Sequence, residues 1–237
     1  MRQGDFRLRA DFALAAGARV ALIGASGSGK STLVNAIAGF VPLASGSIRW
    51  EGKDLGPLAP GDRPLSILFQ DQNLFAHLTV AQNVGLGISP ALRLEARDRR
   101  AVEDALGRVG LAGFGPRLPG SLSGGEAGRV ALARVLLRAR PVMLLDEPFA
   151  ALGPGLKAEM LNLVDEIAAD TGALVVMVTH DPADARRFAR EVVMVDAGEA
   201  AAPVATEALF ADPPPALRSY LGLPPTGSAS PPRPSPR

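Results

Sequence analysis

Cysteine is absent from the 237 residues of this chain, and lysine and histidine are scarce. Without cysteine the chain has no disulfide, no thiolate metal site and no cysteine nucleophile, which suits a reducing compartment. The only lysines are Lys30, Lys53 and Lys157, and the only histidines are His77 and His180. A lysine or histidine at a position that a motif requires is therefore informative.

Excess charge and long apolar runs are also missing. The net charge is +1 and gives no reason to expect nucleic acid or an acidic surface as a partner. No apolar run approaches the ~18 residues of a membrane-spanning helix, and the first predicted strand comes too early for a cleavable signal. We therefore expect any role at a membrane to depend on a partner. With 47% hydrophobic residues, the chain can form one large α/β domain with an insertion.

One glycine-rich stretch, 24–31, reads G-x-x-x-x-G-K-S, the pattern of a phosphate-binding loop. It follows the apolar run Arg19–Ile23 and precedes a helical pattern that ends at Gly39. Glycines let backbone N–H groups approach a phosphate, and the following helix adds its positive dipole end. We assign nucleotide binding to this stretch and its next residue: Gly24, Ala25, Ser26, Gly27, Ser28, Gly29, Lys30, Ser31 and Thr32.

Polar residues follow three further predicted strands. Asp146 and Glu147 end one apolar run, Gln70 ends another and His180 a third. Ligands bind at the carboxyl ends of strands in open α/β sheets. We predict that Ser31 and Asp146 hold Mg²⁺, that Glu147 polarises an attacking water and that His180 contacts a γ-phosphate. Gln70 is predicted either to ligate Mg²⁺ or to orient the water.

A second anion site is predicted where another helix begins. Ser123, Gly124, Gly125 and Glu126 place a capping residue and two glycines at a helix N-terminus. One nucleotide does not need two phosphate sites in one monomer. The economical explanation is a dimer in which this site completes the partner's ATP site.

Alternating strand and helix patterns predict a mostly parallel sheet covered on both faces. The N-terminal alternation of Phe6 and Leu8, then Phe12 and Leu14, predicts edge strands. A helical subdomain is expected at about 89–137 within a domain spanning 1–212. The Pro/Ser-rich tail 213–237 is expected to be disordered beyond Gly222. The remaining predicted strands are 47–50, 65–70, 141–148, 173–180 and 191–196, and the predicted helices are 31–39, 93–110, 123–140, 156–170 and 181–190.

Together, and in this order, these motifs resemble those of the ATP-binding-cassette (ABC) ATPases over roughly residues 10–212. The resemblance implies a P-loop NTPase (RecA-like) core with an N-terminal antiparallel β portion, ATP and Mg²⁺ as ligands, and two subunits closing head to tail on two ATPs. The segment 68–87 is similar to that of the ATPases of bacterial thiamine importers. This implies an ATPase that powers thiamine uptake through a membrane permease at the cytoplasmic face of the inner membrane, with a substrate-binding protein as an indirect partner.

Three positions depart from the ABC family pattern. Phe6 is the candidate for stacking on adenine, although the start is short. Gly128 follows the second anion site, where a glycine inside a helix costs up to ~1 kcal/mol relative to alanine. Gly153 stands where the family has an aspartate that helps couple the two ATP sites. His77 lies in the thiamine-importer-like segment and is interpreted as a packing or permease-docking residue.

Other functions remain open from the sequence. The same ATPase could serve an importer of iron or a polyamine, because the ATPase does not contact the cargo. A soluble cassette of DNA repair or translation is a second alternative, and a regulatory subunit with little turnover is a third. The short insert and balanced charge favour the transporter, while Gly153 is the feature that favours a regulatory subunit.

Overall fold

The computed structural model describes residues 2–3 and 6–224. Its main sheet has eight strands, and the pairs β10–β4, β4–β9, β9–β8 and β8–β7 are all parallel. These central strands are β4 (Arg19–Ile23), β7 (Leu65–Leu68), β8 (Val142–Asp146), β9 (Leu174–Val178) and β10 (Glu191–Asp196). The mostly parallel α/β sheet was predicted and is confirmed. Two strands have the predicted bounds, whereas the strand predicted over 65–70 ends two residues early, at Leu68.

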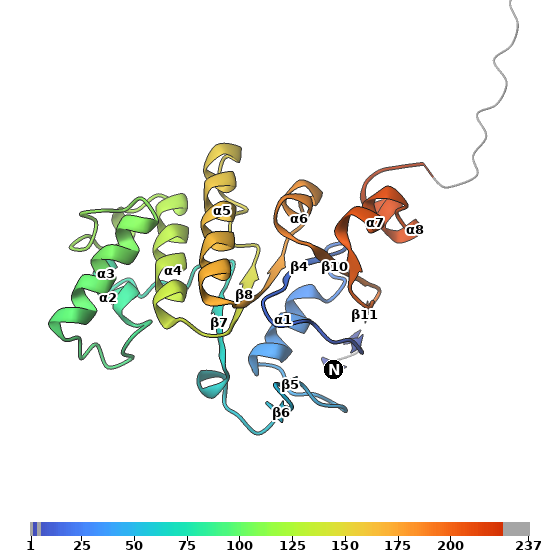
Figure 1. Cartoon of the computed structure of the whole chain (residues 1–237), viewed down its shortest axis with the longest axis horizontal. Helices are drawn as coiled ribbons and strands as arrows, with labels where there is room; N and C mark the ends of the chain where they lie inside the picture. The colour runs from blue at the N-terminus through green and yellow to red at the C-terminus, as the bar shows by residue number, and fades with distance from the viewer. Residues whose placement is uncertain (1, 4–5, 225–237) are drawn as a thin grey trace, which may run out of the picture.

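The two faces of the sheet are covered by different helices (Figure 1). Along β4, Val20 and Leu22 pack on the side of α1 (Lys30–Ala38), whereas Ala21 and Ile23 pack on the opposite side. Burying each large apolar side chain contributes roughly 1.5–3 kcal/mol, so strands that are apolar on both faces need both layers. The opposite layer holds α4 (Gly124–Arg138), α5 (Pro154–Thr171), α6 (Pro182–Phe188), α7 (Thr206–Ala211) and α8 (Pro215–Tyr220).

Three helices between β7 and β8 form a group at one end of the molecule (Figure 1). They are α2 (Val80–Gly85), α3 (Ala96–Arg108) and α4, with a 3₁₀ turn at Pro119–Ser121. The expected lower boundary at residue 89 leaves out α2, which packs on both other helices. α2 has only six residues, too few for a helical period. It is defined instead by the reciprocal capping bonds of Thr79 and Gln82 and by the fully buried Asn83.

The N-terminal part is less regular than predicted. β1 (Arg2–Gln3) and β2 (Phe6–Arg7) pair antiparallel, but β3 (Arg9–Ala10) joins the main sheet parallel to β11 (Glu199–Ala200). No strand forms at Phe12–Leu14, where the alternation predicted one. A separate antiparallel hairpin pairs β5 (Arg49–Trp50) with β6 (Lys53–Asp54), so the strand predicted over 47–50 begins two residues late. A 3₁₀ turn at Pro60–Asp62 precedes β7.

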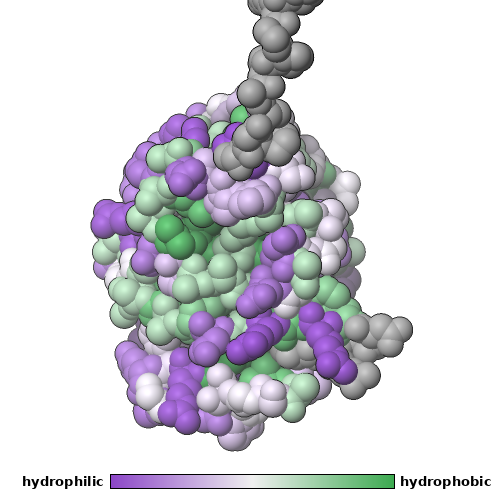
Figure 2. Space-filling model, turned by 90° about the vertical axis from the view of Figure 1, so that its right-hand side faces the viewer, coloured by the Kyte–Doolittle hydropathy of each residue, from purple (hydrophilic) through white to green (hydrophobic). Residues whose placement is uncertain are grey.

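The chain continues beyond the last predicted strand. β10 is followed by β11, β12 (Val204–Ala205), α7 and α8, and both short strands pair with β10. The predicted tail therefore begins with an ordered helix: Leu217 of α8 is 1% exposed and packs in the main core. Most of the residues expected to be disordered, 225–237, lie outside the described residues. Figure 2 shows this end of the molecule, with apolar residues running across the face between hydrophilic ones.

Within residues 2–3 and 6–224, no helix has the length and apolar character that crossing a membrane requires.

Candidate functional site

The glycine-rich loop between β4 and α1 depends on glycine at two positions. Gly24 has φ 150° and Gly29 has φ 113°, values that side chains strongly disfavour. A Cβ at Gly24 would collide with the carbonyl oxygen of Val195 on the adjacent strand. A Cβ at Gly29 would lie 2.9 Å from both Phe6 Cζ and Leu8 Cδ1. The loop therefore packs between β10 and the N-terminal segment, and it leads directly into α1.

Lys30 begins α1 and is only 7% exposed. Its Nζ donates to the backbone carbonyls of Gly24 and Ala25, both at 2.8 Å, so the loop curves around the ammonium group. Burial lowers the pKa of Lys30, and the negative charges of Glu147 and Asp146 oppose that shift. The result is a buried cation in the curve of the loop, which suits an anionic ligand such as a phosphate.

Ser31 and Asp146 meet across the space between α1 and β8. The Ser31 hydroxyl donates to Asp146 Oδ1 at 3.4 Å, and Asp146 is 8% exposed. Burial raises the pKa of Asp146. The charge of Glu147 adds to the rise, while the Ser31 hydrogen bond and the Lys30 charge oppose it. A hydroxyl and a buried carboxylate are hard oxygen donors, which fit Mg²⁺ beside a phosphate.

Glu147 and His180 lie just beyond β8 and β9. Glu147 has φ 46°, the left-handed region that favours glycine, and its N–H donates to Val178 O at 3.1 Å. Its Oε2 lies 3.0 Å from His180 Nδ1. The His180 side chain is 62% exposed and that of Glu147 is 22% exposed. The two side chains therefore meet at a solvent-accessible edge, as expected for groups that receive a substrate.

Gln70 stands in the turn after β7 and is exposed, and among the described residues no hydrogen bond joins it to the others. The structure instead brings two neighbours of Gln70 into contact with α4. Gln72 Nε2 donates to Gly124 O at 3.1 Å. Arg134 donates to the backbone carbonyls of Gln72 and Asn73 at 2.8 and 2.9 Å. The sequence did not single out Gln72 or Arg134 as contact residues, because neither one belongs to a recognisable motif.

The second predicted anion site forms a capped helix start. The Ser123 hydroxyl accepts from Glu126 N at 3.3 Å and donates to Glu126 Oε2 at 2.7 Å, and Ser123 N also donates to Oε2 at 2.7 Å. These two bonds from Ser123 lower the pKa of Glu126. Gly125 is constrained, because a Cβ there would lie 2.9 Å from Leu152 Cδ2. Gly124 has open space around it.

The three departures noted in the sequence have different surroundings. Phe6 packs against Gly29, so it lies beside the phosphate loop. Gly128 is buried in α4, and a Cβ there would touch Gln72 Nε2 at 3.5 Å, an ordinary contact. Gly153 is the N-cap of α5 and provides no capping side chain, although the space around it is open. His77 packs edge to face on Phe75, with ring centroids 6.1 Å apart.

Known proteins share both this sequence and this architecture. The sequence pattern of a family described as ABC transporter matches residues 8–150. A "Thiamine import ATP-binding protein ThiQ" of Cereibacter sphaeroides is 68% identical over 94% of this chain and 96% of its own length. This chain belongs to the ABC transporter family. A ThiQ protein of Ruegeria sp. is 54% identical over the same shares of each chain.

A solved structure confirms the expected fold class of this ABC protein. It is described as a dimeric post-hydrolysis state of the ATP-binding cassette MJ0796 bound to ADP and Pi. It aligns with a TM-score of 0.78 and 27% identity over 87% of this chain and 94% of the other. The P-loop NTPase architecture predicted from the motifs is therefore that of this cassette.

From the buried charge of Asp146 we predict how the stability of the fold depends on pH. A raised pKa in the folded state means that stability falls as pH rises from the ordinary aspartate value through the folded pKa. Once the pH is above the folded pKa, the whole cost of the buried charge is present. We expect Asp146→Asn, without nucleotide, to unfold about 2–4 °C higher at pH 7, a gain of about 1 kcal/mol. The gain should shrink as pH is lowered through the folded pKa, and differential scanning calorimetry measures both.

Asp104→Asn, a change on the exposed face of α3, is the matched control and should leave the melting temperature unchanged. Adding Mg²⁺ and ATP should stabilise the parent protein more than Asp146→Asn, because the variant lacks a carboxylate ligand. Equal melting temperatures for parent and Asp146→Asn at pH 7 would contradict the cost assigned to the buried charge.

Proposed function

We propose that this chain is the ATP-hydrolysing subunit of an ABC importer that takes up thiamine or its phosphates. The observation that carries the proposal is the convergence of Lys30, Ser31, Asp146, Glu147 and His180 around one loop. The cargo rests on the relatives named for thiamine import, which match nearly the whole chain. The geometry of the site thus supports ATP hydrolysis, and the relatives independently support thiamine as the transported molecule.

The converging residues and Gln70 contribute to the proposed hydrolysis in different ways. Loop N–H groups and Lys30 bind the phosphates of ATP, and the dipole of α1 favours their negative charge. Ser31 and Asp146 would hold Mg²⁺, with Gln70 as an alternative ligand, and the metal would supply positive charge at the phosphate oxygens. Glu147 takes a proton from the attacking water, and Gln70 helps to orient that water. His180, whose Nδ1 lies 3.0 Å from Glu147 Oε2, contacts the γ-phosphate.

The proposed working unit is a head-to-tail dimer. One nucleotide does not need a second phosphate site in the same monomer, such as the helix start at 123–126, and the solved relative is a dimer. Ser123 and Gly125 of one subunit face the γ-phosphate held by Lys30 of the other, with Gly124 and Glu126 shaping the turn. The Ser123 hydroxyl, now bonded to Glu126, turns to the phosphate when the subunits close.

The proposed permease-docking surface lies around α2. Phe75 and Leu118 are 49% and 50% exposed, although both are large and apolar. Asn83 holds the Phe75 segment through two bonds with its backbone at 2.8 and 3.1 Å, and Arg117 O accepts from Val80 N at 2.8 Å. Two loop segments with exposed apolar side chains are thus hydrogen-bonded to α2, and we propose that a membrane permease binds there, at the cytoplasmic face of the inner membrane. A substrate-binding protein then acts through the permease.

Uptake tests the cargo. Cells carrying Lys30→Ala in place of the parent protein should lose uptake of labelled thiamine almost completely, because the variant binds ATP more weakly and lacks the positive charge beside its phosphates. Lys53→Ala, an exposed lysine on β6, is the matched control and should leave uptake unchanged. Normal thiamine uptake with Lys30→Ala, together with abolished ATPase activity of the purified variant, would refute thiamine as the cargo and leave the engine standing. Iron and polyamine uptake would then be measured in the same cells.

A further inference from the structure

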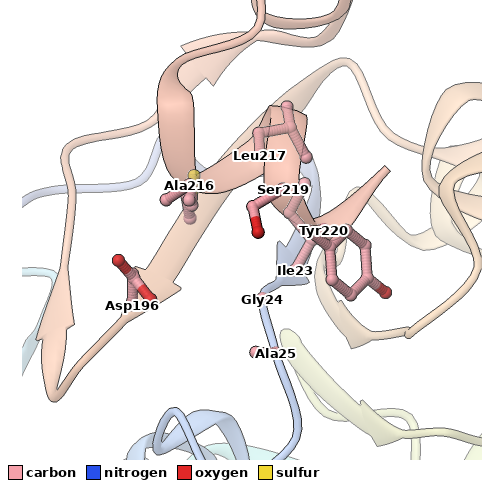
Figure 3. A pocket seen from close by; sticks show the side chains of 9 residues that line it. Ile23, Gly24, Ala25, Asp196, Ala216, Leu217, Ser219 and Tyr220 are labelled. Carbon is pink, nitrogen blue, oxygen red and sulfur yellow. The ribbon is translucent and has the colours of Figure 1, made fainter. Parts of the chain in front are cut away.

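The last helix, α8, lies directly over the phosphate loop. A cavity of about 370 Å³ separates them, with Gly24 and Ala25 on one side and Ser219 and Tyr220 of α8 on another. Figure 3 shows α8 above the end of β4, with the Tyr220 ring beside the loop and Asp196 across the cavity. The buried Leu217 anchors α8 in the core, so this helix forms a fixed wall of the site.

Tyr220 reaches from this wall to the segment that presents His180. Its hydroxyl donates a hydrogen bond to the backbone carbonyl of His180. The imidazole of His180 is otherwise 62% exposed and has Glu147 as its side-chain partner. A hydrogen bond to the backbone carbonyl restricts the orientation of the His180 peptide and so the directions in which its side chain can point. This restriction matters most for an exposed ring, because few packing contacts hold the ring itself.

We infer that Tyr220 is a positioning residue, which fixes the His180 peptide and so aims the imidazole at Glu147 and the γ-phosphate. This inference rests on the proposed function. The phenol is suited to the role, because partial burial raises its pKa, as do the charges of Asp181 and Glu147. The hydroxyl therefore keeps the proton that it donates. The sequence gives no sign of this role, because Tyr220 lies in the Pro-rich segment that was predicted to be the tail.

Tyr220→Phe tests the inference, because it removes the hydroxyl and keeps the ring. We expect kcat for ATP hydrolysis by the full chain to fall about 3- to 10-fold, the effect of one hydrogen bond. The KM for ATP should not change, since Lys30 and the loop are intact. Glu207→Gln, an exposed change on the neighbouring helix α7, is the control and should have the parent kcat. Parent-like kcat in Tyr220→Phe would overturn the inference.

A double-mutant cycle separates positioning from general support of the fold. In a His180→Ala background, Tyr220→Phe should cause no further loss, because there is no imidazole to position. An equal fold-loss in both backgrounds would overturn the inference and assign Tyr220 a different role.

A second readout does not depend on ATPase activity, so it distinguishes a failure of the proposed function from a failure of the inference about Tyr220. The chain has two histidines, so isotope-labelled histidine gives two ring signals, and the His180 signal is the one missing from His180→Ala. We expect Tyr220→Phe to broaden or shift the His180 signal and leave that of His77 unchanged. An unchanged His180 signal would overturn the inference even if the parent protein proved inactive.

Discussion

Replacing Glu147 with glutamine should reduce ATP hydrolysis about 10²- to 10⁴-fold, because an amide cannot accept the proton of the attacking water. Glutamine keeps the length and the hydrogen-bonding oxygen that lies 3.0 Å from His180 Nδ1. ATP binding should survive, since Lys30 and the loop are untouched. Steady-state turnover and nucleotide binding, measured on the same preparation, give the two values.

Glu159→Gln is the matched control, because Glu159 is an exposed carboxylate on α5, away from the strand ends. It should hydrolyse ATP at the parent rate. Parent-like turnover in Glu147→Gln would show that the proton goes to another group.

The same Glu147→Gln variant tests the dimer. With ATP bound and hydrolysis blocked, closed dimers should accumulate and appear in light scattering at twice the monomer mass. If the variant stays monomeric with ATP both alone and with the permease present, the head-to-tail dimer is wrong.

Lys30→Ala should weaken ATP binding by roughly 10- to 100-fold, the size of a lost hydrogen bond to a charged group. The Lys30 ammonium, 7% exposed, also holds the carbonyls of Gly24 and Ala25, so its loss leaves the loop without its internal donor. We therefore expect a lower melting temperature as well. Titration calorimetry measures the affinity.

Lys53→Ala should bind ATP as the parent does, which controls for loss of one positive charge. If Lys30→Ala, still folded by circular dichroism, bound ATP with the parent affinity, the loop would not be the nucleotide site.

The predicted second anion site depends on residues that are close neighbours in the sequence. Ser123 and Glu126 form both capping bonds, as their spacing of three residues allows, so the helix start is determined locally. The contacts of Gln72 and Arg134 are different, because they join residues 62 positions apart through backbone carbonyls. A backbone carbonyl has no residue type, so no sequence pattern marks such a partner.

The sequence by itself determined the parallel α/β core, the phosphate loop and the carboxylates at the end of β8. Each of these depends on short-range features: an apolar run, glycines with φ that side chains disfavour, or a polar residue directly after a strand. Only the tertiary structure decided that α2 belongs to the helical group, that β3 and β11 pair across 190 residues of chain, and that α8 is ordered. These elements have two to six residues, too few to show the hydrophobic periodicity of a helix or a strand. They are stabilised instead by packing on distant parts of the chain. For the same physical reason, Tyr220 becomes a neighbour of His180 only once the chain has folded.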